Sequence, residues 1–205
     1  AGDYKSGIYA YVGNYAQFTD IGDIVQTSGS FSEGYFINNY GSTVEIDANN
    51  IDVNGGITST YCDYTAQGVV YGTTDINVSE NITLTGNINA YQQSTIDINA
   101  NQSNITGDIT SKSGSVVSIT ANTNNFTGNM HAEGENSRIN ITANSQGNVV
   151  GDVSALSGGG VSIDLAGSGS SFIGSSRSTF NSIVSSLVTS LVSDCSNRYS
   201  YRYPE

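Results

Sequence analysis

The sequence of this 205-residue chain predicts an all-β fold, a parallel β-solenoid of about 21–23 residues per coil with a C-terminal amphipathic capping helix. Three observations predict it. A motif repeats with a nearly fixed period, apolar residues alternate within the motif, and Asn, Ser, Thr, Gly and Ile fill most of the chain. β-Branched residues favour strands, whereas dense Asn and Gly disfavour helices. A repeat of this length is typical of a solenoid.

Each repeat opens with a run in which every second residue is apolar. Such alternation is expected of a strand with one buried face. The small alanine that ends several of these runs fits a point where the backbone turns. The runs are Ile96/Ile98/Ala100, Val44/Ile46/Ala48, Val117/Ile119/Ala121 and Ile139/Ile141/Ala143, with looser matches at Ile76/Val78 and Val161/Ile163.

A polar turn and then a second short strand built around a glycine complete each repeat. The glycines are Gly86, Gly107, Gly128, Gly151 and Gly174, spaced 21, 21, 23 and 23 residues apart. A glycine at a fixed place fits either a positive φ or a close approach of two backbones. One such unit cannot bury its apolar side alone, so we expect coils over residues 41–176 to stack with Ile, Val, Phe and Ala inside.

The N-terminal region, residues 1–40, is rich in tyrosine and lacks a clean coil motif. Tyr9 and Tyr11 alternate with Ile8 and Ala10, which predicts strand. The end of a solenoid exposes unpaired backbone groups, and natural proteins cover such edges. We therefore expect strands that cap the solenoid, and the alternative is an adhesive aromatic surface.

Residues 177–195 predict an amphipathic helix. Their apolar residues recur in steps of three and four, and Ser178 and Thr179 suit the N-cap. We expect this helix to cover the last coil. The alternatives are a partner-binding helix or a membrane-surface helix, and the lack of Lys and Arg in the helix after Arg177 argues against the latter. The apolar positions are Phe180, Ile183, Val184, Leu187, Val188, Leu191 and Val192.

The C-terminal tail, residues 196–205, places tyrosines at every second position beside two arginines. It fits a short clasp on its own domain or a strand added to the edge of a neighbouring molecule. Tyrosines at both ends of the chain are the candidate self-association residues: Tyr9, Tyr11, Tyr199, Tyr201 and Tyr203.

The two cysteines, Cys62 and Cys195, lack zinc-site spacing and suggest an oxidising, extracellular compartment. A helix over 179–195 would be about 25 Å long. Roughly six coils, or about 29 Å, separate Cys62 from the end of the solenoid. Folding the helix back along the flank would bring the two sulfurs together. We favour this intramolecular disulfide, and an intermolecular bond is the alternative.

Composition limits the function. The net charge of −12 disfavours nucleic acid and anionic membrane surfaces as partners. A run of 18 apolar residues is absent from the sequence, so we expect no membrane insertion as a helix. An Ala1 start suits the mature end of a secreted chain, although a trimmed chain would look the same.

The sequence also argues against an enzyme. Polysaccharide-cleaving solenoids need clustered carboxylates on one face, with a basic residue or a bound calcium ion. The outward aspartates Asp97, Asp108 and Asp152 form no tight pair by spacing, the few basic residues are scattered, and His131 fits a surface or turn position. We expect no catalytic residues, no cofactor and no metal.

The repeated pattern over residues 41–176, an apolar-x-apolar-x-Ala run followed by apolar-Thr-Gly-x-apolar, resembles the passenger domains of bacterial autotransporters, most closely the self-associating adhesin type. This resemblance implies a right-handed parallel β-helix, secreted and displayed on or released from a Gram-negative cell, that acts in adhesion, aggregation and biofilm formation. The C-terminal β-barrel of that family is not part of this sequence, as expected if it has been cleaved off. The predicted helix and the tyrosine-rich tail have no counterpart in the pattern, so a free secreted subunit that never had a barrel is the alternative.

We therefore expect a secreted or surface-exposed adhesive protein that binds copies of itself and host-cell or matrix glycans or proteins. One alternative is the subunit of an extracellular filament, assembled head-to-tail through the tyrosine-rich ends. A second alternative is a protein that binds or degrades polysaccharide.

The disulfide gives a direct test. If Cys62 and Cys195 pair within one chain, non-reducing electrophoresis of the purified protein will show a single monomer band that migrates differently after reduction. A dimer or a ladder that collapses on reduction would contradict the intramolecular bond.

Overall fold

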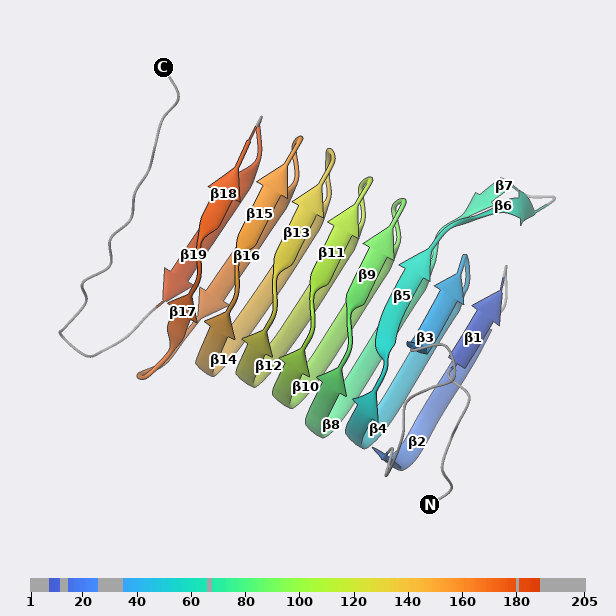
Figure 1. The fold of residues 1–205 in the computed structure, drawn as a ribbon. Coiled ribbons are helices and arrows are strands. Elements are labelled where there is room, and N and C mark those ends of the chain that lie inside the picture. The colour runs from blue at the N-terminus through green and yellow to red at the C-terminus, as the bar shows by residue number, and fades with distance from the viewer. Residues whose placement is uncertain (1–7, 12–14, 26–34, 66–67, 180, 189–205) are drawn as a thin grey trace.

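The computed structural model describes residues 8–11, 15–25, 35–65, 68–179 and 181–188. These residues form a parallel β-solenoid, which confirms the predicted fold class, and none of them is helical. Figure 1 shows the coils stacked in chain order from one end of the molecule to the other.

Each coil contributes one strand to each of two parallel sheets. The short-strand sheet contains β1 (Ile8–Tyr11), β3 (Tyr35–Tyr40), β5 (Gly56–Thr60), β9 (Ile88–Tyr91), β11 (Ile109–Lys112), β13 (Met130–Glu133), β15 (Val153–Leu156) and β18 (Ser176–Ser178). The long-strand sheet contains β2 (Tyr15–Val25), β4 (Thr43–Asn54), β8 (Thr73–Thr85), β10 (Thr95–Thr106), β12 (Val116–Thr127), β14 (Arg138–Val150), β16 (Gly160–Leu165) and β19 (Ile183–Val188), and β17 (Ser171–Ile173) also pairs with β14.

The core is a set of rows that run along the solenoid. The register aligns Ile98 with Ile119, Ile141 and Ile163, and it aligns Ala100 with Ala121 and Ala143. The isoleucine side chains in this core are almost wholly buried. The predicted polar turn after the alanine is instead a bend within one continuous strand, where Asn101 and Gln102 are exposed.

The repeated glycines lie at the corner between a long strand and the following short strand. The prediction of a strand built around each glycine is therefore wrong, because Gly107 and Asp108 separate β10 from β11. At this corner Gly107 has a φ of 146° and its N–H donates to Thr127 O at 2.9 Å. An added Cβ on Gly128 would overlap the carbonyl oxygen of Gly107 on the preceding coil. Both expected reasons for a glycine at a fixed place, a positive φ and a close approach of two backbones, therefore apply at this corner.

Serines stabilise the opposite corner, where a short strand leads into the next long strand. Ser115 Oγ donates to Lys112 O at 2.8 Å, and Ser137 Oγ donates to Glu133 O at 2.7 Å. The Ser137 oxygen also accepts from the N–H of Gly114 on the preceding coil, at 3.0 Å. Each serine thus closes its own turn and the Ser137 bond links two coils.

The N-terminal strands continue the same two sheets. β1 pairs in parallel with β3, and β2 pairs in parallel with β4, in the registers used by the later coils. A two-stranded antiparallel hairpin, β6 (Cys62–Thr65) and β7 (Gly68–Val70), interrupts the coil between β5 and β8. Figure 1 shows it projecting from the solenoid. This insertion lengthens the coil between the apolar run at Val44 and the run at Ile76.

The predicted C-terminal helix is wrong where the structure describes it. β18 and β19 are strands, and β19 pairs with β16 so that Val184 lies beside Val161. Apolar residues at 183, 184, 187 and 188 fit either a helix or a strand. Strand pairing satisfies the open backbone edge of β16, which a helix could not do. Residues 189–195 of the predicted helix and the tail at 196–205 lie outside the described residues.

The glycine corner yields a stability prediction. Gly128→Ala should lower the free energy of unfolding by about 3 kcal/mol, because it combines a disfavoured φ of 150° with overlap against backbone. Gly169→Ala is the matched control. Gly169 also has a positive φ, 82°, but its nearest atom is a flexible side-chain nitrogen at 3.7 Å, so the cost should be about 1 kcal/mol. Urea denaturation followed by circular dichroism measures both, and equal costs would refute the packing argument.

Candidate functional site

The outer surface carries rows of like side chains, because equivalent residues of successive coils are adjacent. At the glycine corner, Asn87 Oδ1 accepts the N–H of Asp108 at 2.9 Å, and Asp108 Oδ1 accepts the N–H of Asn129 at 2.8 Å. Asp152 accepts both the N–H and the hydroxyl of Ser175. These two donors hold the pKa of Asp152 below its usual range.

A second row runs along the long-strand sheet and consists of amides. Asn125 Nδ2 donates to Asn104 Oδ1 at 2.9 Å, and Asn148 Nδ2 donates to Asn125 Oδ1 at 3.1 Å. Ser171 continues the row by donating to Asn148 at 3.0 Å. The amides fix one another in position, so this row presents a regular array of polar groups at the strand spacing of about 4.8 Å.

An acidic row lies on the outer face of the N-terminal coils. The register places Glu45, Asp75 and Asp97 directly beside one another on three adjacent strands. Partial burial raises the pKa of Asp75, and the charges of Asp97, Glu45 and Asp47 raise it further. Burial also raises the pKa of Asp97. Sequence reasoning missed this row, although the 22-residue spacing of Asp75 and Asp97 was a usable signal.

A mixed polar cluster lies on the outer face of the short-strand sheet. His131 Nδ1 is 2.7 Å from Ser154 Oγ, and His131 Nε2 is 3.2 Å from Glu133 Oε2. Lys112 forms an ion pair with the same carboxylate at 2.8 Å, and its hydrogen bond is the main cause of the lowered pKa of Glu133. His131 thus lies on the surface, as predicted, but on a strand.

Ser154, His131 and Glu133 contact one another in the order hydroxyl, imidazole and carboxylate, which is the order found in a nucleophile–base–carboxylate triad. Acyl transfer also requires donors for the developing oxyanion, which are often backbone N–H groups. Strand β15, which carries Ser154, is hydrogen-bonded on both sides, to β13 and to β18. The neighbouring backbone amides are therefore already used by the sheet, and the contacts fit a surface hydrogen-bond network.

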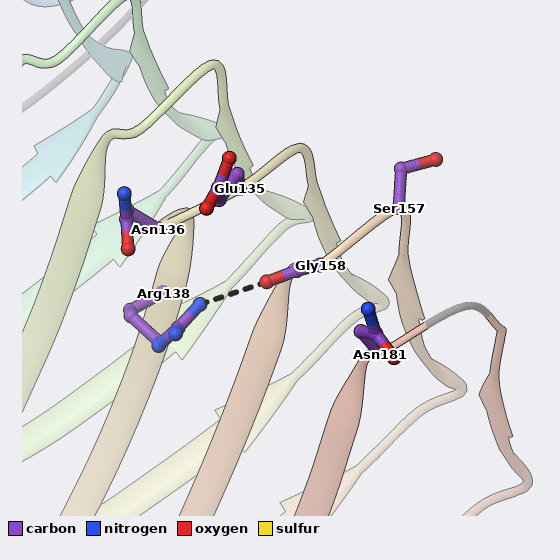
Figure 2. Close-up of a pocket in the computed structure, with 6 residues that line it drawn as sticks. All are labelled: Glu135, Asn136, Arg138, Ser157, Gly158 and Asn181. Carbon is purple, nitrogen blue, oxygen red and sulfur yellow. Dashed lines mark hydrogen bonds between the residues drawn. The ribbon is translucent and has the colours of Figure 1, made fainter.

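A solvent-open cleft of about 560 Å³ lies where the turns of the last described coils stack (Figure 2). Arg138 extends along it, and its Nη1 donates to Ser137 O at 2.7 Å and to Gly158 O at 3.1 Å. The guanidinium therefore bonds the turns to one another, which is a structural role. The cleft is lined by Glu135, Asn136, Arg138, Ser157, Gly158 and Asn181.

The structure does not bring the predicted site residues together. Tyr9 and Tyr11 belong to β1, and Cys62 begins the β6–β7 hairpin. Cys195, Tyr199, Tyr201 and Tyr203 lie outside the described residues. The disulfide and the aromatic contacts stay predictions.

Among the described residues, no group of three or more His, Cys, Asp or Glu side chains is arranged to hold a metal ion. No helix of sufficient length and apolarity to cross a bilayer occurs in this part of the chain. No family model, curated protein or solved structure matches the chain.

The acidic row predicts how stability depends on pH. Because the pKa of Asp75 is raised on folding, the folded protein binds this proton more tightly than the unfolded chain. The free energy of unfolding therefore decreases as the pH rises from the ordinary Asp pKa to the raised one, and stays lower above it. Asp75→Asn should raise the free energy of unfolding at pH 7 by about 0.5 kcal/mol and give no gain near pH 3.

Asp152→Asn is the control for this experiment. It makes the same change in net charge, but at a carboxylate whose pKa is lowered on folding. We expect no gain in stability at pH 7 from this control. Urea midpoints at the two pH values measure the effect, and equal gains from both variants would show that net charge alone is responsible.

Proposed function

We propose that this chain is the elongated part of an adhesive protein, extracellular or displayed on a bacterial cell surface, that associates with copies of itself. The observation that carries the proposal is the ordered outer surface, in which rows of amide and hydroxyl groups repeat from coil to coil. A surface with a regular repeat fits another surface with the same repeat, and many weak contacts then add together.

The resemblance to autotransporter passenger domains of the self-associating adhesin type supports this proposal. That resemblance implies a parallel solenoid, and the chain has that fold. The finer identity, with its location outside the cell and its roles in cell adhesion and biofilm formation, is part of the proposal. The partners we propose are other copies of the chain and host-cell or matrix glycans or proteins.

The proposed mode of action is binding without catalysis. The Ser154–His131–Glu133 contacts lie on the outer face of a sheet whose backbone amides are used by neighbouring strands. Support for adhesion comes instead from shape, since the described residues form an elongated stack of coils with a polar, regularly spaced surface.

Self-association can be measured directly. We expect sedimentation velocity of the purified chain, with reductant present, to show larger species as the protein concentration rises. Salt should promote them, because screening weakens the mutual repulsion of chains that each carry a net charge of −12. Non-aggregating bacteria that display the chain should settle as clumps. A chain that stays monomeric at every concentration and salt, with cells that stay dispersed, would contradict the proposal.

A further inference from the structure

Both ends of the described solenoid present open strand edges. At the N-terminal end, β1 pairs only with β3 and β2 only with β4. At the other end, β18 pairs only with β15 and β19 only with β16. The outer edge of each of these strands has no partner among the described residues. Such an edge is a template for another strand.

The C-terminal end is also apolar. Ile173, Ile183 and Leu187 are 63%, 64% and 58% exposed, which is unusual for large aliphatic side chains in this molecule. Val184 and Phe172 pack against the core but are only partly buried. A neighbouring strand on this edge would cover Val184, as β19 covers Val161 of the same inward row.

We propose that the partner at this end is the N-terminal end of a second copy, with β18 and β19 of one molecule pairing in parallel with β1 and β2 of the next. This inference rests on the proposed self-association and adds an end-to-end contact to the contacts between the faces of the rods. The second copy is the occupant because each joint between coils inside the chain already has this form. An intermolecular joint would repeat the same two parallel pairings.

The existing register specifies which residues would meet. The row that starts at Ala16 passes through Val44, one residue per coil, and ends at Val184. The row that ends at Ile183 starts at Tyr15 in the same strands. Extending the stack by one coil in this register makes Val184 a neighbour of Ala16 and Ile183 a neighbour of Tyr15. Both pairs join apolar or aromatic residues.

The short-strand sheet gives a third pair. The row that starts at Tyr9 passes through His131 and Ser154 and ends at Arg177. In the proposed joint, Arg177 of one molecule and Tyr9 of the next become cross-strand neighbours. Arginine beside tyrosine is a favourable combination, because a guanidinium is attracted to an aromatic face. This assigns the predicted self-association residue Tyr9 a specific partner.

The distribution of charge along the chain favours contact between the N-terminal end of one molecule and the C-terminal end of another. Residues 1–102 contain 11 acidic and 1 basic residues, a net charge of −10, whereas residues 103–205 contain 7 acidic and 5 basic residues, a net charge of −2. Two N-terminal ends would therefore repel each other most strongly, and an N-terminal end is repelled less by a C-terminal end. A head-to-tail contact uses different surfaces on the two molecules, so it does not close and gives a linear polymer.

Two variants that each block one end test the proposal. Ile183→Asp places a charge on the C-terminal edge, and Tyr15→Asp places one on the N-terminal edge. The test uses low salt, where the net charge of −12 opposes contacts between the faces of the rods. Each variant alone should then be monomeric by sedimentation velocity at concentrations where the unchanged chain associates. A mixture in equal amounts should form a dimer and nothing larger. The unchanged N-terminal edge of the Ile183→Asp variant can pair with the unchanged C-terminal edge of the Tyr15→Asp variant, and both remaining edges are blocked. Val69→Asp adds the same charge to an exposed aliphatic position on the β6–β7 hairpin, outside all the edge strands, and should associate like the unchanged chain.

The outcomes separate this inference from the proposed function. Circular dichroism first establishes that the three variants fold. If both end variants still associate, or if their mixture stays monomeric, the end-to-end joint is wrong while self-association through the faces of the rod stands. If the unchanged chain never associates, the proposed function and this inference fail together.

Discussion

The close approach of backbones at the glycine corner is the constraint on which the rest of the structure depends. Gly107 and Gly128 each lie so near the backbone of the preceding coil that a side chain on either glycine would overlap it. A coil shifted by one residue would place a larger residue there. The same shift would turn every inward residue outward, because strand side chains alternate. The corner therefore fixes the register of both sheets, and the core rows follow from it.

Stacking in register acts on the surface as well as on the core. It brings equivalent residues of successive coils together in every row, and whether they attract or repel each other depends on their chemistry. Amides such as Asn104 and Asn125 donate to and accept from each other. Carboxylates such as Asp75 and Asp97 repel each other, and the pKa of Asp75 is raised partly for this reason. The alternation of Asn and Asp at the glycine corner keeps like charges two coils apart there.

The coils could be predicted from the sequence because period and alternation carry the same information at every repeat. The structural role of some individual residues could not be predicted from the sequence. A glycine inside a short apolar run fits a strand or a corner equally, and only the neighbouring coil decides. Ile183, Val184 and Leu187 fit a helix as well as a strand, and the open edge of β16 selects the strand. The acidic row was hidden because the alignment of Glu45 with Asp75 crosses the β6–β7 insertion.

The ends of the solenoid follow from nearest-neighbour energetics. In a stacked repeat, each coil is stabilised mainly by the coils on either side, so a terminal coil has about half of that contact. The last described coil is weaker still. Its short strand is Ser176–Ser178, in which all three residues are exposed, whereas earlier coils bury Ile109, Met130 and Val153. A strand added at this coil would pair with backbone groups that have no partner among the described residues, whereas the strands of a coil in the middle of the rod are paired on both sides.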